Sequence, residues 1–116
     1  MLSTYANRKL VQARNYDFGR PVTAYLANAR FSACSCIAQT YGHLKAWPDG
    51  MFADGHHIWT SDVRQVDEWP GFWAFHTLSG SYYVVVTFER FNGRRSLDEL
   101  VKILSRGVYP SPSRSH

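Results

Sequence analysis

The clearest alternation of apolar and polar positions lies in residues 72–88. There, two aromatic and β-branched runs, FWAFHTL and SYYVVVTF, flank Ser79-Gly80. Small turn residues between two such runs indicate a β-hairpin. We expect a two-residue loop, which pairs His76 with Tyr83. One face of this hairpin then carries a dense apolar patch of Trp73, Phe75, Tyr82, Val84 and Val86.

Earlier segments have the same period of two. Residues 22–31 and 32–44 alternate in this way, and we expect two antiparallel strands with a break near residues 28–30. Residues 56–66, HHIWTSDVRQV, are also typical of a strand, but their apolar positions fall out of strict alternation halfway along. A bulge near Ser61-Asp62 would return these positions to one face of the strand.

Two segments have the period of a helix. Near the C-terminus, a stripe of leucines and valine follows Ser96, with Glu99 three residues later as in a capping box, so we predict a helix over residues 97–105. Residues 2–14 fit a short helix capped by Ser3, although KLVQAR within them also alternates like a strand. The predicted fold class is α+β: an antiparallel, curved β-sheet with a C-terminal helix and a short N-terminal helix.

The length of 116 residues suits one domain, which can bury about two-thirds of the surface of its unfolded chain. We assign residues 1–108 to a single α+β domain and residues 109–116, rich in Pro and Ser, to a flexible tail. No apolar run approaches the roughly 20 residues of a membrane span, and the N-terminus has no export signal. We therefore expect a cytoplasmic protein.

The net charge of +4 and the isoelectric point near 9.3 favour an acidic protein or a nucleic acid as partner. Three arginines surround the turn before the C-terminal helix, where guanidinium groups suit phosphates or carboxylates, although a solvated turn has the same composition. Tryptophan, tyrosine and arginine are also common anchors of interfaces, although the tryptophans equally suit a core. The predicted partner-binding residues are Arg90, Arg94, Arg95, Trp47, Trp69 and Tyr83.

The histidines and cysteines do not form a recognisable metal or catalytic motif. His56 and His57 are adjacent, so on a strand they point to opposite faces. His76 could form an acid–base pair with His57 only if their strands lie side by side, and no nucleophile motif accompanies them. Cys34 and Cys36 are too few for a zinc site and are typical of reduced core thiols. We predict no catalytic residue, no metal and no cofactor.

A spaced series of turn and strand residues runs through residues 42–86. Its members are Gly42, His43, Asp54, Gly55, Ile58, Thr60, Ser61, Val63, Thr77, Ser79, Gly80, Ser81 and Tyr83. The series resembles the frame G-H…D-G-x-x-I-x-T-S-x-V…T-x-S-G-S-x-Y-x-V of small bacteriophage and prophage accessory proteins. The chain departs from that frame by inserting LKAWPDGMFA between the first two motifs, and the first 40 residues and the C-terminal helix lie outside it.

The resemblance implies a phage-encoded, non-enzymatic inhibitor that binds a host defence complex in the bacterial cytoplasm. The expected activity is that of an anti-CRISPR protein, which blocks a CRISPR–Cas effector or its helicase–nuclease by protein–protein contact. A basic inhibitor must dock on an acidic protein surface or occlude a nuclease subunit, since it cannot mimic DNA. Two alternatives stay open: a small nucleic-acid-binding accessory or regulatory protein, and a hydrolase or nuclease based on His57 and His76. Exposed β-edges also suit a homodimer.

Overall fold

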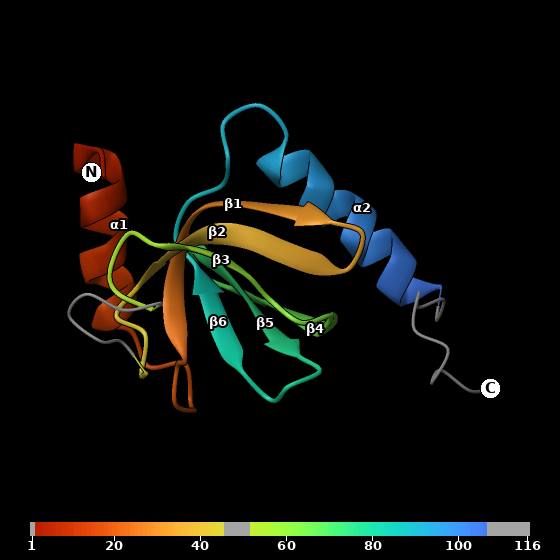
Figure 1. Ribbon diagram of the computed structural model, residues 1–116, viewed down its shortest axis with the longest axis horizontal. Helices are drawn as coiled ribbons and strands as arrows, with labels where there is room; N and C mark the ends of the chain where they lie inside the picture. Colours follow the sequence, from red (N-terminus) through yellow and green to blue (C-terminus); the bar gives the residue numbers. More distant parts are fainter. Residues whose placement is uncertain (1, 46–51, 107–116) are drawn as a thin grey trace.

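A single six-stranded sheet organises the chain, with one helix before it and one after it (Figure 1). The structure is a computed structural model that describes residues 2–45 and 52–106. Its elements are α1 (Thr4–Arg14), β1 (Ala24–Ser32), β2 (Ser35–Tyr41), β3 (His57–Trp59), β4 (Val63–Trp69), β5 (Phe72–Thr77), β6 (Tyr82–Val85) and α2 (Gly93–Ser105). The α+β class is confirmed, and the N-terminal segment is a helix.

The strand order is β3-β2-β1-β6-β5-β4. The central pair, β1 and β6, is parallel, and every other neighbouring pair is antiparallel. The sheet is therefore mixed, whereas the sequence predicted an antiparallel one. Neither of the helices in the described part of the chain is long and apolar enough to cross a membrane. The predicted tail, residues 109–116, lies outside the described residues.

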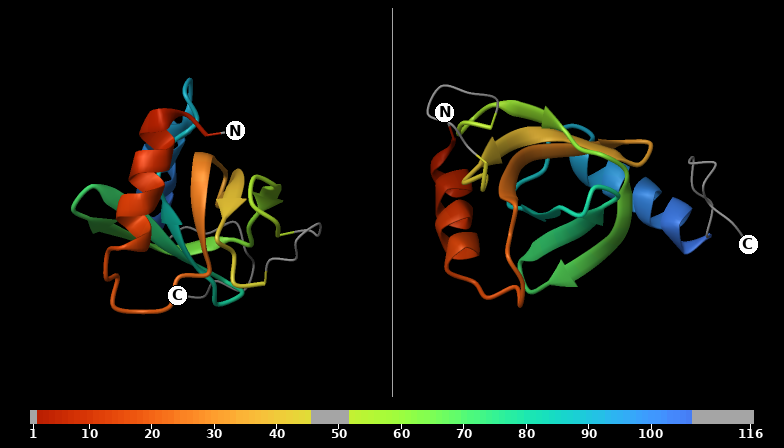
Figure 2. Two further views of the ribbon diagram at one scale, coloured as in Figure 1. Left: turned by 90° about the vertical axis from the view of Figure 1, so that its left-hand side faces the viewer. Right: turned by 60° about the horizontal axis from the view of Figure 1, so that its bottom comes forward.

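The sheet curls because its two edge strands are consecutive in the chain. Between β3 and β4, the backbone N–H of Thr60 donates to the carbonyl of Cys36 at 2.9 Å, and that of Val63 donates to the carbonyl of Cys34 at 2.7 Å. Residues 60–62 thus carry the chain from one edge of the sheet to the other, and the strands form a partly closed barrel (Figure 2). The prediction of one strand over residues 56–66 with a bulge near Ser61-Asp62 is wrong, because the strand ends there and its two halves belong to opposite edges of the sheet.

Two apolar clusters cover the two faces of the sheet. The inner cluster joins strands far apart in the sheet order, such as β2 and β4, which is consistent with a concave face, and α2 adds Leu97 and Leu100 to it. The outer cluster lies under α1 and the segment after it, with Ala13 and Phe18 packed against β5 and β6. Because both faces are covered, all four residues of β6 are buried.

The β5–β6 hairpin exists, but its predicted register is wrong by one residue. His76 pairs with Tyr82, because the loop has three residues and Thr77 N–H donates to the carbonyl of Ser81 at 3.0 Å. Such a loop needs a positive φ only at its last position, where Gly80 has a φ of 90°, whereas a two-residue loop would require one at Ser79. A shift of one residue exchanges the faces of a strand. The inner cluster accordingly takes Trp73, Phe75, Tyr83 and Val85, and the outer one takes Tyr82, Val84 and Val86.

The predicted break between the first two strands is also displaced. The turn lies at Ala33-Cys34, and β1 continues through residues 28–30 with a register shift between Ala27 and Arg30. Asn28 has a φ of 54° at this irregularity. A bulge and a turn both interrupt the period of two, so the sequence pattern alone did not separate them.

Helix α2 begins at Gly93, not at residue 97, and Asn92 occupies the N-cap position. A Cβ on Gly93 would lie 2.5 Å from the carbonyl oxygen of Ala29, so a glycine is required for this close approach to β1. Ser96 is not the cap. It is buried inside the first turn, where its hydroxyl donates to the carbonyl of Gly93 at 2.6 Å and accepts from the N–H of Phe31 at 2.8 Å.

This role of Ser96 can be tested by substitution. Ser96→Ala leaves the buried N–H of Phe31 without an acceptor, so we expect the free energy of unfolding to fall by about 1 to 3 kcal/mol in urea titrations. Ser96→Asp should destabilise as well, because it places a carboxylate in a buried position, whereas an N-cap would accept Asp without loss. Ser105→Ala, at the exposed end of α2, is the control and should change stability by less than about 0.5 kcal/mol. An unchanged stability of Ser96→Asp would restore the capping interpretation.

Candidate functional site: a cationic groove beside two helix N-termini

A groove with a cavity volume of about 950 Å³ lies between the first half of α1, the β4–β5 turn and the start of α2. In the left view of Figure 2, the N-terminal end of α1 and the loop before α2 lie at the same end of the molecule. Cations and aromatic rings both line this groove. They include Tyr5, Lys9, Trp69, Trp73, Arg90 and Arg94. We call this feature the cationic groove.

Lys9 connects α1 to the β4–β5 turn on one side of the groove. Its ammonium group donates to the carbonyl of Gly71 and lies 4.1 Å from the centroid of the Phe72 ring. The negative face of an aromatic ring attracts a cation in this geometry. The charge is thereby held at the wall of the groove.

Arg94 occupies the other side, on the first turn of α2. Its guanidinium carbon lies 5.1 Å from the centroid of the Trp73 ring and 6.0 Å from that of Phe88. One amino group, Nη1, forms an ion pair with Asp98, four residues later on the same helix. Two aromatic rings and one ion pair therefore restrain the guanidinium.

Large aromatic rings next to these cations are exposed. Tyr5, which lines the groove from α1, is 61% exposed. The guanidinium of Arg90 lies 5.6 Å from the centroid of the Phe91 ring, which is 84% exposed and lies beside the groove without lining it. Among the described lining residues, three are cationic and only Glu68 is acidic. The groove therefore has an excess of positive charge and open aromatic faces.

The structure brings three of the predicted binding residues together, since Arg90, Arg94 and Trp69 all line the cationic groove. Trp69 is half-buried, and its indole N–H donates to the hydroxyl of Tyr82 at 3.0 Å, so part of its role is structural. Arg95 is exposed on α2 but does not line the groove. The groove also includes Lys9, which the sequence analysis missed because its neighbours are more than sixty residues away in the chain.

One further predicted binding residue is not part of the groove. Tyr83 is only 7% exposed and belongs to the inner cluster, so its prediction as a surface contact is wrong. The error follows from the register of the hairpin, which turns this side chain inward. Trp47 lies outside the described residues.

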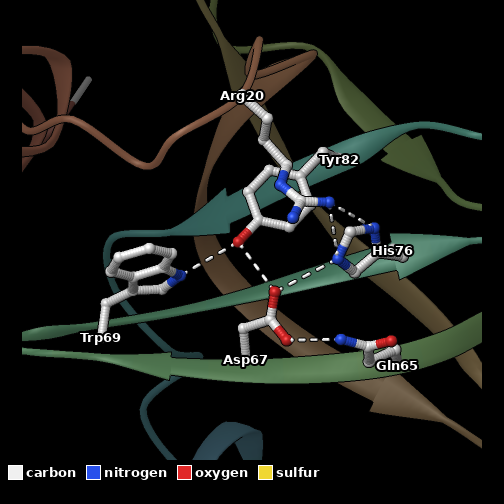
Figure 3. A network of polar contacts seen from close by, with 6 residues as sticks. All are labelled: Arg20, Gln65, Asp67, Trp69, His76 and Tyr82. Atoms are coloured by element: carbon white, nitrogen blue, oxygen red, sulfur yellow. Dashed lines mark hydrogen bonds and ion pairs between the residues drawn. The ribbon is translucent and has the colours of Figure 1, made fainter.

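A second polar cluster surrounds Asp67 on β4 (Figure 3). One carboxylate oxygen accepts from the hydroxyl of Tyr82 and lies beside Nε2 of His76, both at 3.1 Å, and the other accepts from the amide of Gln65 at 2.8 Å. The guanidinium of Arg20 lies 5.0 Å from the centroid of the Tyr82 ring, with its Nη1 3.3 Å from Nε2 of His76. The cluster thus ties the segment after α1 to three strands.

Burial by itself raises the pKa of Asp67, but the hydrogen bonds from Gln65, Tyr82 and His76 outweigh it and hold the pKa below its ordinary value. Asp67 is therefore ionised at neutral pH and acts as an acceptor. Burial and the nearby Asp67 carboxylate raise the pKa of Tyr82. The polar groups of this cluster therefore satisfy one another through hydrogen bonds.

The structure does not form the His57–His76 pair on which the hydrolase alternative depends. His57 lies opposite Gln39 of β2, whereas His76 lies opposite Gln65 and Tyr82 on the other half of the sheet. Within residues 2–45 and 52–106, no three His, Cys, Asp or Glu side chains come together as metal ligands would.

Both cysteines are buried core thiols, as predicted. Cys36 lies on β2, whereas Cys34 lies in the β1–β2 turn and not on a strand. Burial raises the pKa of each thiol, and the nearby Asp62 carboxylate raises that of Cys34 further. Neither is poised as a reactive thiolate.

Comparison with models of known protein families, with curated proteins and with solved structures found no match to this chain. The resemblance to phage accessory proteins therefore stays a prediction.

The Asp67 cluster predicts a pH-dependent contribution to stability. Because the pKa of Asp67 is lowered in the folded state, the ionised carboxylate stabilises the protein fully above about pH 5, and this stabilisation is lost as the pH falls through the folded pKa. Asp67→Asn should lower the free energy of unfolding by about 1 to 3 kcal/mol at neutral pH. The difference from wild type should shrink below about pH 4 in urea titrations at graded pH.

Asp98→Asn, in an exposed ion pair, is the control and should cost less than about 1 kcal/mol. A deficit of Asp67→Asn that is the same at every pH would contradict the assignment of an ionised, hydrogen-bonded carboxylate.

Proposed function

We propose that this protein is a non-enzymatic binding protein that holds an anionic partner in the cationic groove. The observation that supports this best is the convergence of Lys9, Arg90 and Arg94 on one concavity, each with its charge next to an aromatic ring. Positive charge and exposed rings in a concave site are features of interfaces more than of an ordinary solvated surface.

The contacts of these cations also reduce the cost of binding. A long side chain that becomes immobile at an interface loses about 0.5 to 1.5 kcal/mol of conformational freedom. The ring and hydrogen-bond contacts of Lys9, and the ring and ion-pair contacts of Arg94, restrict these side chains before any partner arrives. The net charge of +4 would in addition attract an anionic partner over a distance.

The cellular role that the resemblance implies is inhibition of a CRISPR–Cas complex by a phage protein in the host cytoplasm, and it stays a prediction, as does the homodimer. A basic groove is compatible with docking on an acidic surface of such a complex.

The proposal predicts that anion binding depends on the cations of the groove and not on net charge alone. Heparin, a sulfated polyanion, serves as the probe in titrations at graded salt. Arg90→Gln/Arg94→Gln should bind more weakly than wild type, and the slope of log affinity against log salt should become shallower by about 0.7 per lost contact, the value for flexible single strands.

The matched control is Lys102→Gln/Arg106→Gln, which removes the same charge from the other end of α2. This control variant should bind heparin about as tightly as wild type does. Its salt slope should differ from that of wild type by no more than the change expected for about one lost contact. Equal losses in the two double variants would mean that net charge alone attracts the polyanion, and the groove would not be the site.

A further inference from the structure

We infer that the partner of the cationic groove is a single-stranded nucleic acid, whose bases stack on Arg94, Phe91 and Tyr5 while its phosphates meet Arg90 and Lys9. This inference rests on the proposed function, since it names the partner class of the same groove.

Arg94 lies among aromatic rings with one of its amino groups occupied. Its Nη1 is engaged by Asp98, and its guanidinium carbon lies 5.1 Å from the centroid of the Trp73 ring and 6.0 Å from that of Phe88. The side chain is still 51% exposed, so we expect part of the guanidinium plane to be accessible to a base. A carboxylate binds arginine through the edge of the guanidinium, whereas a nucleic-acid base stacks on its plane. The contacts of Arg94 therefore favour a base.

One exposed ring lines the groove, and a second lies beside it next to Arg90. Tyr5 comes from α1, and Phe91 precedes α2 next to Arg90. Their exposed fractions of 61% and 84% leave large apolar surfaces in water, which stacked bases would cover. The bases of a duplex already stack on one another and hide their faces, so open rings favour a single strand.

Phosphates need cations whose donors are within reach of the groove. Arg90 is exposed beside Phe91, and Lys9 has an ammonium group with donors beyond the one given to Gly71. A groove that holds both cations and aromatic rings can take both the phosphates and the bases of a strand. An acidic peptide would use the charges but not the rings.

The experiment uses the whole chain and fluorescence anisotropy of labelled oligothymidylate and oligouridylate of about 12 nucleotides, within the site sizes of single-strand binders. A DNA duplex and a polyglutamate peptide of matched charge are the competing probes. We expect the single strands to bind about tenfold or more tightly than the duplex or the peptide at the same salt. The two oligonucleotides separate DNA from RNA, because they differ in the 2′-hydroxyl.

Two kinds of variant separate stacking from charge. Phe91→Ala and Tyr5→Ala should each weaken oligonucleotide binding about tenfold and leave heparin binding unchanged, because they remove a stacking ring and no charge. Arg94→Lys keeps the charge but lacks the planar face, so it should weaken oligonucleotide binding and retain the salt slope of wild type. Trp59→Ala is the matched control, because this ring is 68% exposed on β3, outside the groove.

Thermal unfolding of every variant checks that the fold is retained. Oligonucleotide binding that survives Phe91→Ala, Tyr5→Ala and Arg94→Lys, or binding of polyglutamate as tight as that of the single strands, would overturn the inference and leave the proposed function in place. Failure of every polyanion, heparin included, to bind would overturn both.

Discussion

The contact of the first turn of α2 with β1 determines where the functional part of this molecule lies. Gly93 allows the helix to approach the carbonyl of Ala29, and the hydroxyl of Ser96 supplies the acceptor that the N–H of Phe31 lacks on a bulged strand. A buried N–H without an acceptor is costly, so this hydrogen bond anchors the helix at one place along the strand. Arg94, one residue after the glycine, is consequently placed over the ring of Trp73.

The other wall of the groove depends on the curl of the sheet. Residues 60–62 take the chain from the edge beside β2 to the edge beside β5, so β4 and its turn into β5 are carried round the inner cluster. The turn then lies next to α1, where Lys9 reaches the carbonyl of Gly71. The groove is therefore formed by three parts of the chain that are distant in sequence, and it exists only when the sheet has closed this far.

Local patterns predicted the elements of this fold better than their connections. The apolar stripe of α2 and the aromatic runs around Gly80 were recognised because each depends on residues close in the chain. The register of the hairpin depends on the φ of single loop residues, and the role of Ser96 depends on a partner 65 positions away, so neither had a local signal. For the same reason the sequence suggested Arg90 and Arg94 but could not pair them with Lys9.

The ion pair between Arg94 and Asp98 shows how a weak interaction can still have a functional consequence. An exposed pair four residues apart on a helix adds only about 0.3 to 0.5 kcal/mol to stability. Its effect on the guanidinium is local, because it engages Nη1 while the guanidinium carbon stays near the rings of Trp73 and Phe88. In the proposed complex this residue would be a stacking platform that also carries a charge, and such a platform suits a chain in which flat bases alternate with phosphates.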